Sequence, residues 1–297
     1  MNLIDGKALS QEIKDDIQQE VEIIRQQGGK IPHLAAVIVG DDPASQTYVK
    51  NKVLSCEKVG FKSTLIQKEA DISEDELLAI VDSLNTDKDI DGFIVQLPLP
   101  PHIDPERVNL AIDPTKDVDG FHPINFGRMT LGLPAYLSAT PQGILMMLER
   151  YNIETSGKKC VVIGRSNIVG RPMSILLSQK RDKGNCTVTV VHSRTADVKK
   201  ETLDADIVIA AIGSAHFVKA DMIKPGAVVI DVGTNRIEDA SRKRGWRLVG
   251  DVDFEHVSKV ASYITPVPGG VGPMTITSLL INTLKASKKE IYSHDEL

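Results

Sequence analysis

Apolar and polar residues along this chain follow the alternation of helix and strand that α/β proteins show. An apolar stripe at helical spacing begins at Leu9 and stops at Gly28, and the continuous apolar run 34–39 follows it. A helical period and then an uninterrupted apolar run predict an amphipathic helix and a strand buried on both faces. The same pattern predicts strands at 61–66 and 93–97 and helices at 45–58 and 73–84, capped by Ser45 and Ser73.

A second alternating block begins after a stretch that is rich in Pro, Gly and Asp. That stretch, residues 113–134, indicates a junction between two domains. The strands and helices beyond it predict a doubly wound parallel sheet. A final helix is expected from about Pro273 to Lys288, packing back on the first domain. The strands expected in this block are 159–163, 187–191, 206–212 and 227–232, and its helices begin at about Thr140 and Val169.

The length agrees with two domains, because a single core stops growing at about 250–300 residues and this chain has 297. We expect an α/β protein whose residues 1–139 form a small α/β domain, completed by the C-terminal helix over residues 273–297. Residues 140–272 are expected to form a Rossmann-like domain with a doubly wound parallel sheet.

Composition narrows the range of partners. The net charge is -5, and aromatic residues make up 4% of the chain. We therefore expect no basic surface for binding nucleic acid or an anionic membrane. We also expect no aromatic surface on which bases could stack. No apolar run is long enough to span a bilayer.

The cysteines and the ends of the sequence favour the cytoplasm. Cys56, Cys160 and Cys186 are odd in number and are not spaced as metal ligands, so we expect free thiols in a reducing compartment and no metal site. The first residues lack the basic and apolar parts of a signal peptide. Residues 294–297 match an endoplasmic-reticulum retrieval signal, and we interpret this match as coincidence because no entry sequence accompanies it.

The turn after strand 159–163 is a candidate phosphate site. It runs from Gly164 to Gly170 and opens a helix, so its backbone N–H groups could cradle a phosphate. Its spacing is not that of GxGxxG, because residue 166 is Ser. The alternative is that Gly164 and Gly170 only permit a tight turn and close helix packing.

The residues after the next strand favour NADP over NAD. NAD sites often place an acid here for the ribose 2′-hydroxyl, but this strand is followed by Ser193 and Arg194, with no acid before Asp197. Together with Arg165 they could meet a 2′-phosphate, although Arg194 as a solvated loop arginine is an equal alternative. Small residues end two further strands, at 211–213 and 232–234.

Three polar residues of the first block are candidates for chemistry. Tyr48 and Lys52 are four residues apart and share one helical face, although spacing alone favours an exposed pair. Gln96 lies in an apolar strand, and a buried amide needs partners, so it bonds nearby backbone or faces a site. Asp117 and Asp119 precede Gly120, and two acids beside a glycine are usually explained by a turn alone.

Taken together, these segments resemble the bifunctional methylenetetrahydrofolate dehydrogenase/cyclohydrolase family. The match covers essentially the whole chain in order, and the joint occurrence of its long motifs is highly specific. One departure is visible, because the family usually has Cys where this chain has Ala139, a position without a known catalytic duty. The matching stretches are 40–52, 95–100, 116–123, 162–172 and the Pro- and Gly-rich loop 264–275.

The resemblance implies two reactions and a homodimer formed through the cofactor domains. The family oxidises 5,10-methylene-tetrahydrofolate by hydride transfer to NADP and then hydrolyses the 5,10-methenyl cation to 10-formyl-tetrahydrofolate. By motif, Lys52 is the main catalytic residue, Tyr48 stacks on the folate, Gln96 positions Lys52 and the substrate, and Asp119 holds the pterin edge. The resemblance and the loop positions give these further candidates: for the folate cleft, Pro266, Gly269, Gly270 and Pro273; for NADP, Gly164, Arg165, Ser166, Ser193, Arg194 and Thr234.

This resemblance leads to a hypothesis about the amine of Lys52. A cleft between the domains would hold the pterin against the nicotinamide, and hydrolysis needs an activated water at a cationic carbon. A protonated Lys52 would repel that cation, so we expect desolvation and the nearby charge to lower its pKa, letting it take a proton from water. The alternatives are shikimate dehydrogenase, which lacks the Pro- and Gly-rich loop, and a non-catalytic dinucleotide sensor.

Overall fold

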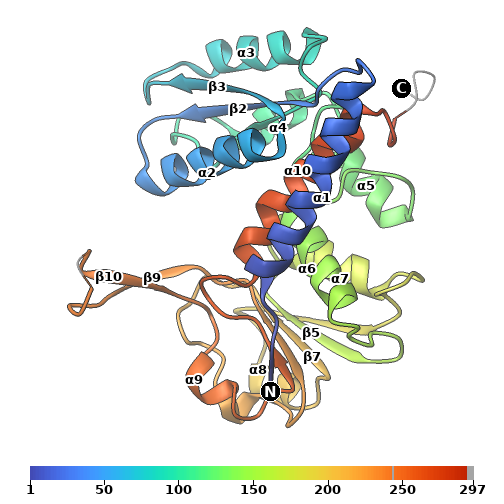
Figure 1. Cartoon of the computed structure of the whole chain (residues 1–297). Coiled ribbons are helices and arrows are strands. Elements are labelled where there is room, and N and C mark those ends of the chain that lie inside the picture. The colour runs from blue at the N-terminus through green and yellow to red at the C-terminus, as the bar shows by residue number, and fades with distance from the viewer. Residues whose placement is uncertain (243, 293–297) are drawn as a thin grey trace. The chain divides into compact units, whose positions relative to one another are not determined.

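The computed structural model describes residues 1–242 and 244–292, and the chain forms two compact units. We call residues 11–139, together with the segment that starts at Ile276, the three-stranded unit. Residues 1–10 and 140–275 form the six-stranded unit. Each is built on a parallel sheet with helices on its faces (Figure 1), which confirms the predicted two-part α/β fold. The tetrapeptide 294–297 lies outside the described residues.

The three-stranded unit has the strand order β3-β2-β4, with all strands parallel. Alternate residues of the central strand pack into two separate apolar clusters, so this strand is buried on both faces as predicted. Helices α1, α2 and α10 contribute to one cluster, and α3 and α4 to the other. The elements are α1 Gly6–Gln26, β2 His33–Val39, α2 Pro43–Val59, β3 Lys62–Lys68, α3 Glu74–Thr86, β4 Gly92–Val95, α4 Pro105–Ala111, α5 Pro123–Leu131 and α10 Val271–Ser287.

The C-terminal helix packs where the sequence placed it. Leu279, Leu280 and Leu284 of α10 lie in the same apolar cluster as Ile17 and Val21 of α1. The helix is buried over most of its length, as expected for one that neighbouring elements enclose. It therefore completes the core of the three-stranded unit.

The six-stranded unit has the strand order β1-β11-β8-β7-β5-β6, and every pairing in it is parallel. Strand β5 lies between β6 and β7, the two strands that follow it in sequence, so the winding reverses direction beside β5. Ligands of such sheets bind outside the carboxyl ends of the strands at this reversal. The elements are β1 Asn2–Leu3, α6 Ala139–Arg150, β5 Lys159–Ile163, α7 Gly170–Ser178, β6 Thr187–Val191, α8 Val198–Leu203, β7 Ile207–Ala210, the 3₁₀ turn Ala220–Met222, β8 Val228–Asp231, β9 Asn235–Glu238, β10 Trp246–Val249, α9 Phe254–Val257 and β11 Tyr263–Ile264.

Two helices begin upstream of their predicted starts, by two residues and by one. Helix α2 begins at Pro43, and its N-cap is Asp42, whose side chain accepts the N–H of Ser45. A carboxylate followed by proline is a strong start signal that lies upstream of the serine. Helix α6 begins at Ala139, so Thr140 lies inside its first turn. The capping box at the start of α3 is confirmed.

The stretch 113–134 has more structure than its composition suggests. It contains α5, which starts with His122 as N-cap and proline at its first position. The ring nitrogen Nδ1 of His122 accepts the N–H of Ile124 at 3.1 Å, so the imidazole replaces the hydroxyl or carboxylate that usually marks a helix start. Among the described residues, no helix has the length and apolar character that crossing a membrane requires.

Candidate active site

Lys52 is the centre of a polar cluster in the three-stranded unit. Its side chain projects from α2 and is 5% exposed. The amine Nζ donates to Oε1 of Gln96 at 3.3 Å and lies 4.7 Å from the centre of the Tyr48 ring. The predicted face shared by Tyr48 and Lys52 therefore turns inward. We call Tyr48, Lys52 and Gln96 the Lys52 cluster.

The packing of α2 explains this orientation. Val49 and Cys56 of the same helix are buried in the apolar cluster beneath it, which fixes the rotation of the helix about its axis. Tyr48 and Lys52 lie one turn apart on an adjoining face and are held at the carboxyl ends of the strands, where α2 starts after β2.

Gln96 follows the last residue of β4 and has a fixed orientation. Its backbone N–H continues the strand ladder by donating to the carbonyl of Val37 at 2.8 Å. Its side-chain Nε2 donates to the carbonyl of Leu97 at 2.7 Å. Because the amide nitrogen is committed to this carbonyl, the oxygen Oε1 faces the amine of Lys52.

Burial changes the proton affinity of the amine. Desolvation lowers the pKa of Lys52 below that of an ordinary lysine, while the negative charges of Asp119 and of a Cys56 thiolate act to raise it. Burial makes the neutral form of this amine more accessible than on a surface lysine. The neutral form has a lone pair that can accept a proton.

The two acids of the turn before α5 have different positions. Asp117 is buried and accepts N–H groups of Phe121 and His122 at 3.2 and 2.8 Å and Nδ2 of Asn125 at 2.9 Å. Desolvation raises the pKa of Asp117 to about 7, although these hydrogen bonds oppose the shift. Asp119 is half-buried. Asp117 thus anchors the turn, and Asp119 supplies its second carboxylate.

The glycine turn after β5 has a conformation that other residues could not adopt. Gly164 has φ +120°, and a Cβ there would lie 2.3 Å from the carbonyl oxygen of Ala211. A Cβ on Gly170 would lie 2.3 Å from the carbonyl oxygen of Gly164. Between these buried glycines, residues 165–168 are exposed. Tight packing and exposed residues therefore coexist in this turn, so a packing role and a binding role do not exclude each other.

Ser166 has a local partner in this turn. Its Oγ accepts the N–H groups of Val169 and Gly170 at 3.2 and 3.3 Å, so it caps the start of α7. The expected role toward the cofactor would use its exposed backbone and the remaining capacity of its hydroxyl.

The residues after β6 lie at the same edge of the sheet as this turn. Strands β5 and β6 are parallel neighbours, and the N–H of Gly164 donates to the carbonyl of Val191 at 2.8 Å. The turn after β6 leaves Ser193 and Arg194 exposed, as is Arg165 after β5. Two guanidinium groups and a hydroxyl at one edge fit a phosphate ester.

The remaining candidates also belong to the six-stranded unit. Thr234 is exposed in the turn after β8. In the Pro- and Gly-rich loop, the N–H of Gly270 donates to the carbonyl of Pro266 at 2.8 Å, and Gly269 has φ +107°. The carbonyl of Pro273 accepts the hydroxyl of Ser10 at 3.3 Å. The Lys52 cluster and Asp119 thus belong to one unit, and the cofactor and loop candidates to the other.

Sequence reasoning missed Asp251, which binds the backbone of the turn after β7 and the side chain of Asn235. The available signal was a carboxylate inside the otherwise apolar stretch from Val249 to Val252. A charged residue in such a stretch must be paired or hydrogen-bonded when it is buried. In the described part of the chain, no group of three or more His, Cys, Asp or Glu side chains is arranged to hold a metal ion.

Comparisons with known proteins match both units. Residues 4–119 match the catalytic domain of the tetrahydrofolate dehydrogenase/cyclohydrolase family, and residues 138–291 match its NAD(P)-binding domain. The bifunctional protein FolD of Bacteroides fragilis is 63% identical over 98% of this chain and 100% of its own length.

Two solved structures share the fold. The bifunctional FolD methylenetetrahydrofolate dehydrogenase/cyclohydrolase of Campylobacter jejuni is 47% identical with a TM-score of 0.92, covering 98% of this chain and 99% of that one. The methylenetetrahydrofolate dehydrogenase-cyclohydrolase of Trypanosoma brucei, solved with NADP and an inhibitor, is 38% identical with a TM-score of 0.92 and covers 98% of each chain.

Proposed function

This chain belongs to the tetrahydrofolate dehydrogenase/cyclohydrolase family, and we infer that it catalyses both reactions on one polypeptide. It is an NADP-dependent enzyme of one-carbon metabolism. It oxidises 5,10-methylene-tetrahydrofolate to 5,10-methenyl-tetrahydrofolate and hydrolyses that cation to 10-formyl-tetrahydrofolate. Membership of the family sets aside shikimate dehydrogenase and a non-catalytic sensor as alternatives.

The proposal about mechanism rests on one observation, the buried amine of Lys52 bonded to the amide oxygen of Gln96. We assign this amine as the proton acceptor of the hydrolytic step. A water molecule forms a bond from its oxygen to the bridging carbon of the methenyl cation and loses a proton to Nζ. The bond from that carbon to N5 then breaks as the remaining O–H loses its proton and becomes the formyl carbonyl, and N5 takes up one proton. The proton held on Nζ is released, so hydrolysis yields one proton overall.

The charge state of the amine matters to both reactions. Oxidation of the methylene group creates a positive charge on the folate, and a second positive charge close by in a desolvated site would oppose its formation. Burial lowers the pKa of Lys52, so the neutral amine is more accessible than on a surface lysine. Gln96 accepts a hydrogen bond from either form and holds the amine in place. NADP, when bound, supplies the acceptor for the hydride.

The other candidates have binding roles in this proposal. Tyr48 offers a ring for stacking on the pterin, and Asp119 offers a carboxylate that accepts N–H groups of the pterin edge. The following residues complete the assignment: Pro266, Gly269, Gly270 and Pro273 toward the folate; Gly164, Arg165, Ser166, Ser193, Arg194 and Thr234 toward NADP.

We also propose a cytoplasmic homodimer that associates through the six-stranded unit. The three free and buried thiols, Cys56, Cys160 and Cys186, suit a reducing compartment. Light scattering on the purified chain measures the assembly state, and a monomeric mass at micromolar concentration would refute the dimer.

Substitution of Lys52 tests the mechanism. In Lys52→Met, hydrolysis of 5,10-methenyl-tetrahydrofolate should fall by about 100-fold to 10,000-fold, the range that positioned acid–base groups contribute. The rate of hydride transfer should fall less, because no proton moves to the amine in that step. Both rates are measured by absorbance, starting from the methylene and from the methenyl compound.

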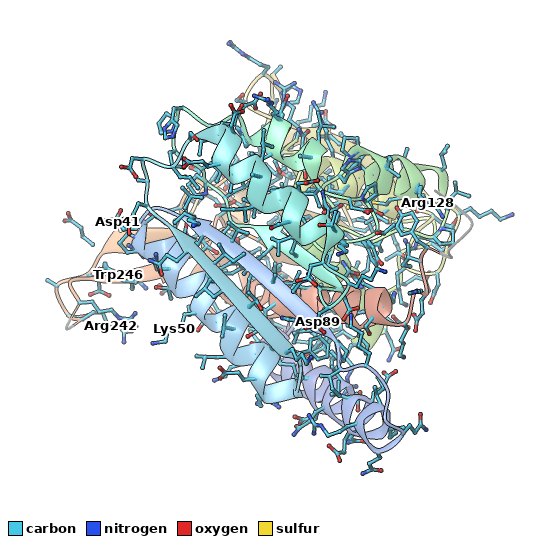
Figure 2. The ribbon with its side chains drawn as sticks, turned by 90° about the horizontal axis from the view of Figure 1, so that it is seen from above. Asp41, Lys50, Asp89, Arg128, Arg242 and Trp246 are labelled. Atoms are coloured by element: carbon cyan, nitrogen blue, oxygen red, sulfur yellow. The ribbon has the colours of Figure 1, made fainter. Side chains whose placement is uncertain are left out.

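Lys50→Met is the matched control. Lys50 is exposed on the same helix, and its side chain extends away from the ribbon of α2 (Figure 2). Both activities of this variant should equal those of the wild type. Hydrolysis at the wild-type rate in Lys52→Met would remove the amine from the mechanism.

A further inference from the structure

Two buried carboxylates in the six-stranded unit have no part in the function proposed so far. Asp231 is the last residue of β8 and is 2% exposed, and Asp251 is fully buried. The backbone between them packs closely: a Cβ on Gly233 would lie 2.3 Å from Oδ1 of Asp251, and one on Gly250 would lie 1.7 Å from Oδ2 of Asp231. These contacts require glycine at both positions.

Asp251 fastens two turns to each other. Its Oδ2 accepts the N–H groups of Ile212 and Gly213 at 2.7 and 3.0 Å. Its Oδ1 accepts the N–H of Ser214 at 2.8 Å and Nδ2 of Asn235 at 2.9 Å. Both oxygens are therefore occupied by donors of the protein, which fits an anchor and not a cation site.

Asp231 fixes the position of Asp251. One oxygen of Asp231 accepts the N–H groups of Gly233 and Asp251, both at 2.9 Å, and the other accepts that of Val252 at 2.9 Å. The N–H of Asp231 itself donates to Oγ1 of Thr265 at 2.7 Å. The backbone of Asp251 cannot shift without breaking these charge-assisted bonds, which are about twice as strong as neutral ones.

The fastened turns lie where a bound dinucleotide would extend. Residues 212–214 follow β7, and residues 233–235 follow β8, at the carboxyl ends of strands on the side of β5 that is opposite β6. The candidate phosphate turn, residues 164–170, follows β5. The candidates for the 2′-phosphate are Arg165 after β5 and Ser193 and Arg194 after β6. A dinucleotide with its adenosine half at β6 and its pyrophosphate at β5 therefore directs its nicotinamide half toward β7 and β8.

We propose that Asp251 is a positioning residue for the nicotinamide half of NADP, acting through the turns 212–214 and 233–235. This inference rests on the NADP-dependent function proposed above. Exposed Ser214 and Thr234 offer polar groups from these turns, and the carboxylate holds both turns in one arrangement before the cofactor arrives. Preformed turns bind more tightly because less conformational entropy is lost on binding.

The variant Asp251→Asn tests whether this carboxylate positions the NADP site or only stabilises the fold. Asp251→Asn keeps the size of the side chain, but its amide nitrogen would face N–H donors, so the two hydrogen bonds that one of the carboxylate oxygens accepts are lost. We expect the dissociation constant for NADP, measured by calorimetry without folate, to rise about tenfold, with a similar rise in KM. Hydrolysis of methenyl-tetrahydrofolate without NADP should stay within about twofold of the wild type, because that step needs no hydride acceptor.

Asp206→Asn is the matched control. Asp206 precedes β7 at the opposite, amino end of the strands, where it accepts the N–H of Lys159 and pairs with Lys224. The same chemical change there should leave NADP affinity unaltered. Asn235→Ala is a milder second variant that removes one of the bonds to Asp251. About a threefold weaker NADP affinity is expected, with a melting temperature lowered by no more than a few degrees.

The outcomes separate the two proposals. Unchanged NADP affinity in both Asp251→Asn and Asn235→Ala overturns the positioning role, and so does a parallel loss of both activities with a melting temperature lowered by more than a few degrees in Asn235→Ala. A wild-type chain that neither binds NADP nor turns over the folates would instead refute the proposed function. If Asp251→Asn does not fold, the calorimetry of Asn235→Ala decides.

Discussion

The Lys52 cluster and the turns that follow the strands of the six-stranded unit achieve specificity in different ways. In the Lys52 cluster, one buried amine with fixed neighbours can carry a chemical step, so the identity of a single side chain matters. In the turns, glycine conformations set the course of the backbone, and Asp251 holds residues 212–214 in place through their N–H groups. A substitution in the Lys52 cluster should therefore remove a reacting group, whereas a substitution in the turns should alter the shape of the cofactor site.

This difference also predicts which activity each region controls. Hydrolysis depends on a proton acceptor and should respond most to the Lys52 cluster. Oxidation depends in addition on the cofactor and should respond to both regions. The hydrolytic rate therefore serves as an internal control. A variant that loses oxidation but keeps hydrolysis is altered in the turns and not in the Lys52 cluster.

The largest effect on the turns is expected from Gly164→Ala. The new Cβ would overlap the carbonyl oxygen of Ala211 at 2.3 Å, and φ +120° is unfavourable for alanine. The turn must shift, and NADP affinity should fall by about 100-fold, which corresponds to roughly 3 kcal/mol. Calorimetry measures this loss, and the hydrolytic rate without NADP should remain within about threefold of the wild type.

Gly157→Ala is the control for backbone strain. Gly157 also has a positive φ, +71°, but no atom lies within 4 Å of its expected Cβ. This variant should lose about 1 kcal/mol of stability and retain its NADP affinity. Wild-type affinity in Gly164→Ala would show that the turn after β5 does not shape the cofactor site.

A smaller effect, on the choice between NADP and NAD, is expected from Arg194→Gln. If the guanidinium meets the 2′-phosphate, its loss should raise KM for NADP about tenfold and leave KM for NAD unchanged. Steady-state assays with the two cofactors give this ratio. Arg242→Gln is the control, because Arg242 is exposed at the end of the β9–β10 hairpin (Figure 2). Equal changes for NADP and NAD in Arg194→Gln would exclude a 2′-phosphate contact.

The periodic elements could be predicted from the sequence, because each has a pattern of its own. The continuous apolar run of β2 and the helical stripe of α1 predict burial by simple geometry, and the structure has both. Strands β1 and β11 contain two residues each. Such short strands form because a neighbouring strand is in place, and no local period reveals them.

The polar partners could not be predicted from local patterns. Spacing placed Tyr48 and Lys52 on one face, but an exposed pair fitted it equally well. Burial decides between these readings, and burial depends on β4 and the turn before α5, which are distant in sequence. Asp251 was missed for the same reason, since its donors come from residues 212–214 and 235.

The smallest expected effect on activity concerns Asp117, which anchors the turn containing Asp119 in the three-stranded unit and acts on stability. Burial raises the pKa of Asp117 to about 7 in the folded chain, far above its value in an unfolded chain. Between about pH 4 and 7 the folded state therefore binds more protons than the unfolded state at this site. The stability that protonated Asp117 contributes is complete below about pH 4 and is lost as the pH rises through 7.

Asp117→Asn should remove this pH dependence. The N–H groups of Phe121 and His122 bond different oxygens of Asp117, so asparagine keeps an acceptor for one of them, and it carries no charge to desolvate. Relative to the wild type, the variant should become more stable as the pH rises from 5 to 8, by roughly 2 to 3 kcal/mol. Thermal melts across this range measure the difference, with Asp82→Asn on the exposed side of α3 as control. A constant difference between Asp117→Asn and the wild type would mean that Asp117 stays ionised in the folded chain, and the hydrogen bonds from the turn would then outweigh its burial.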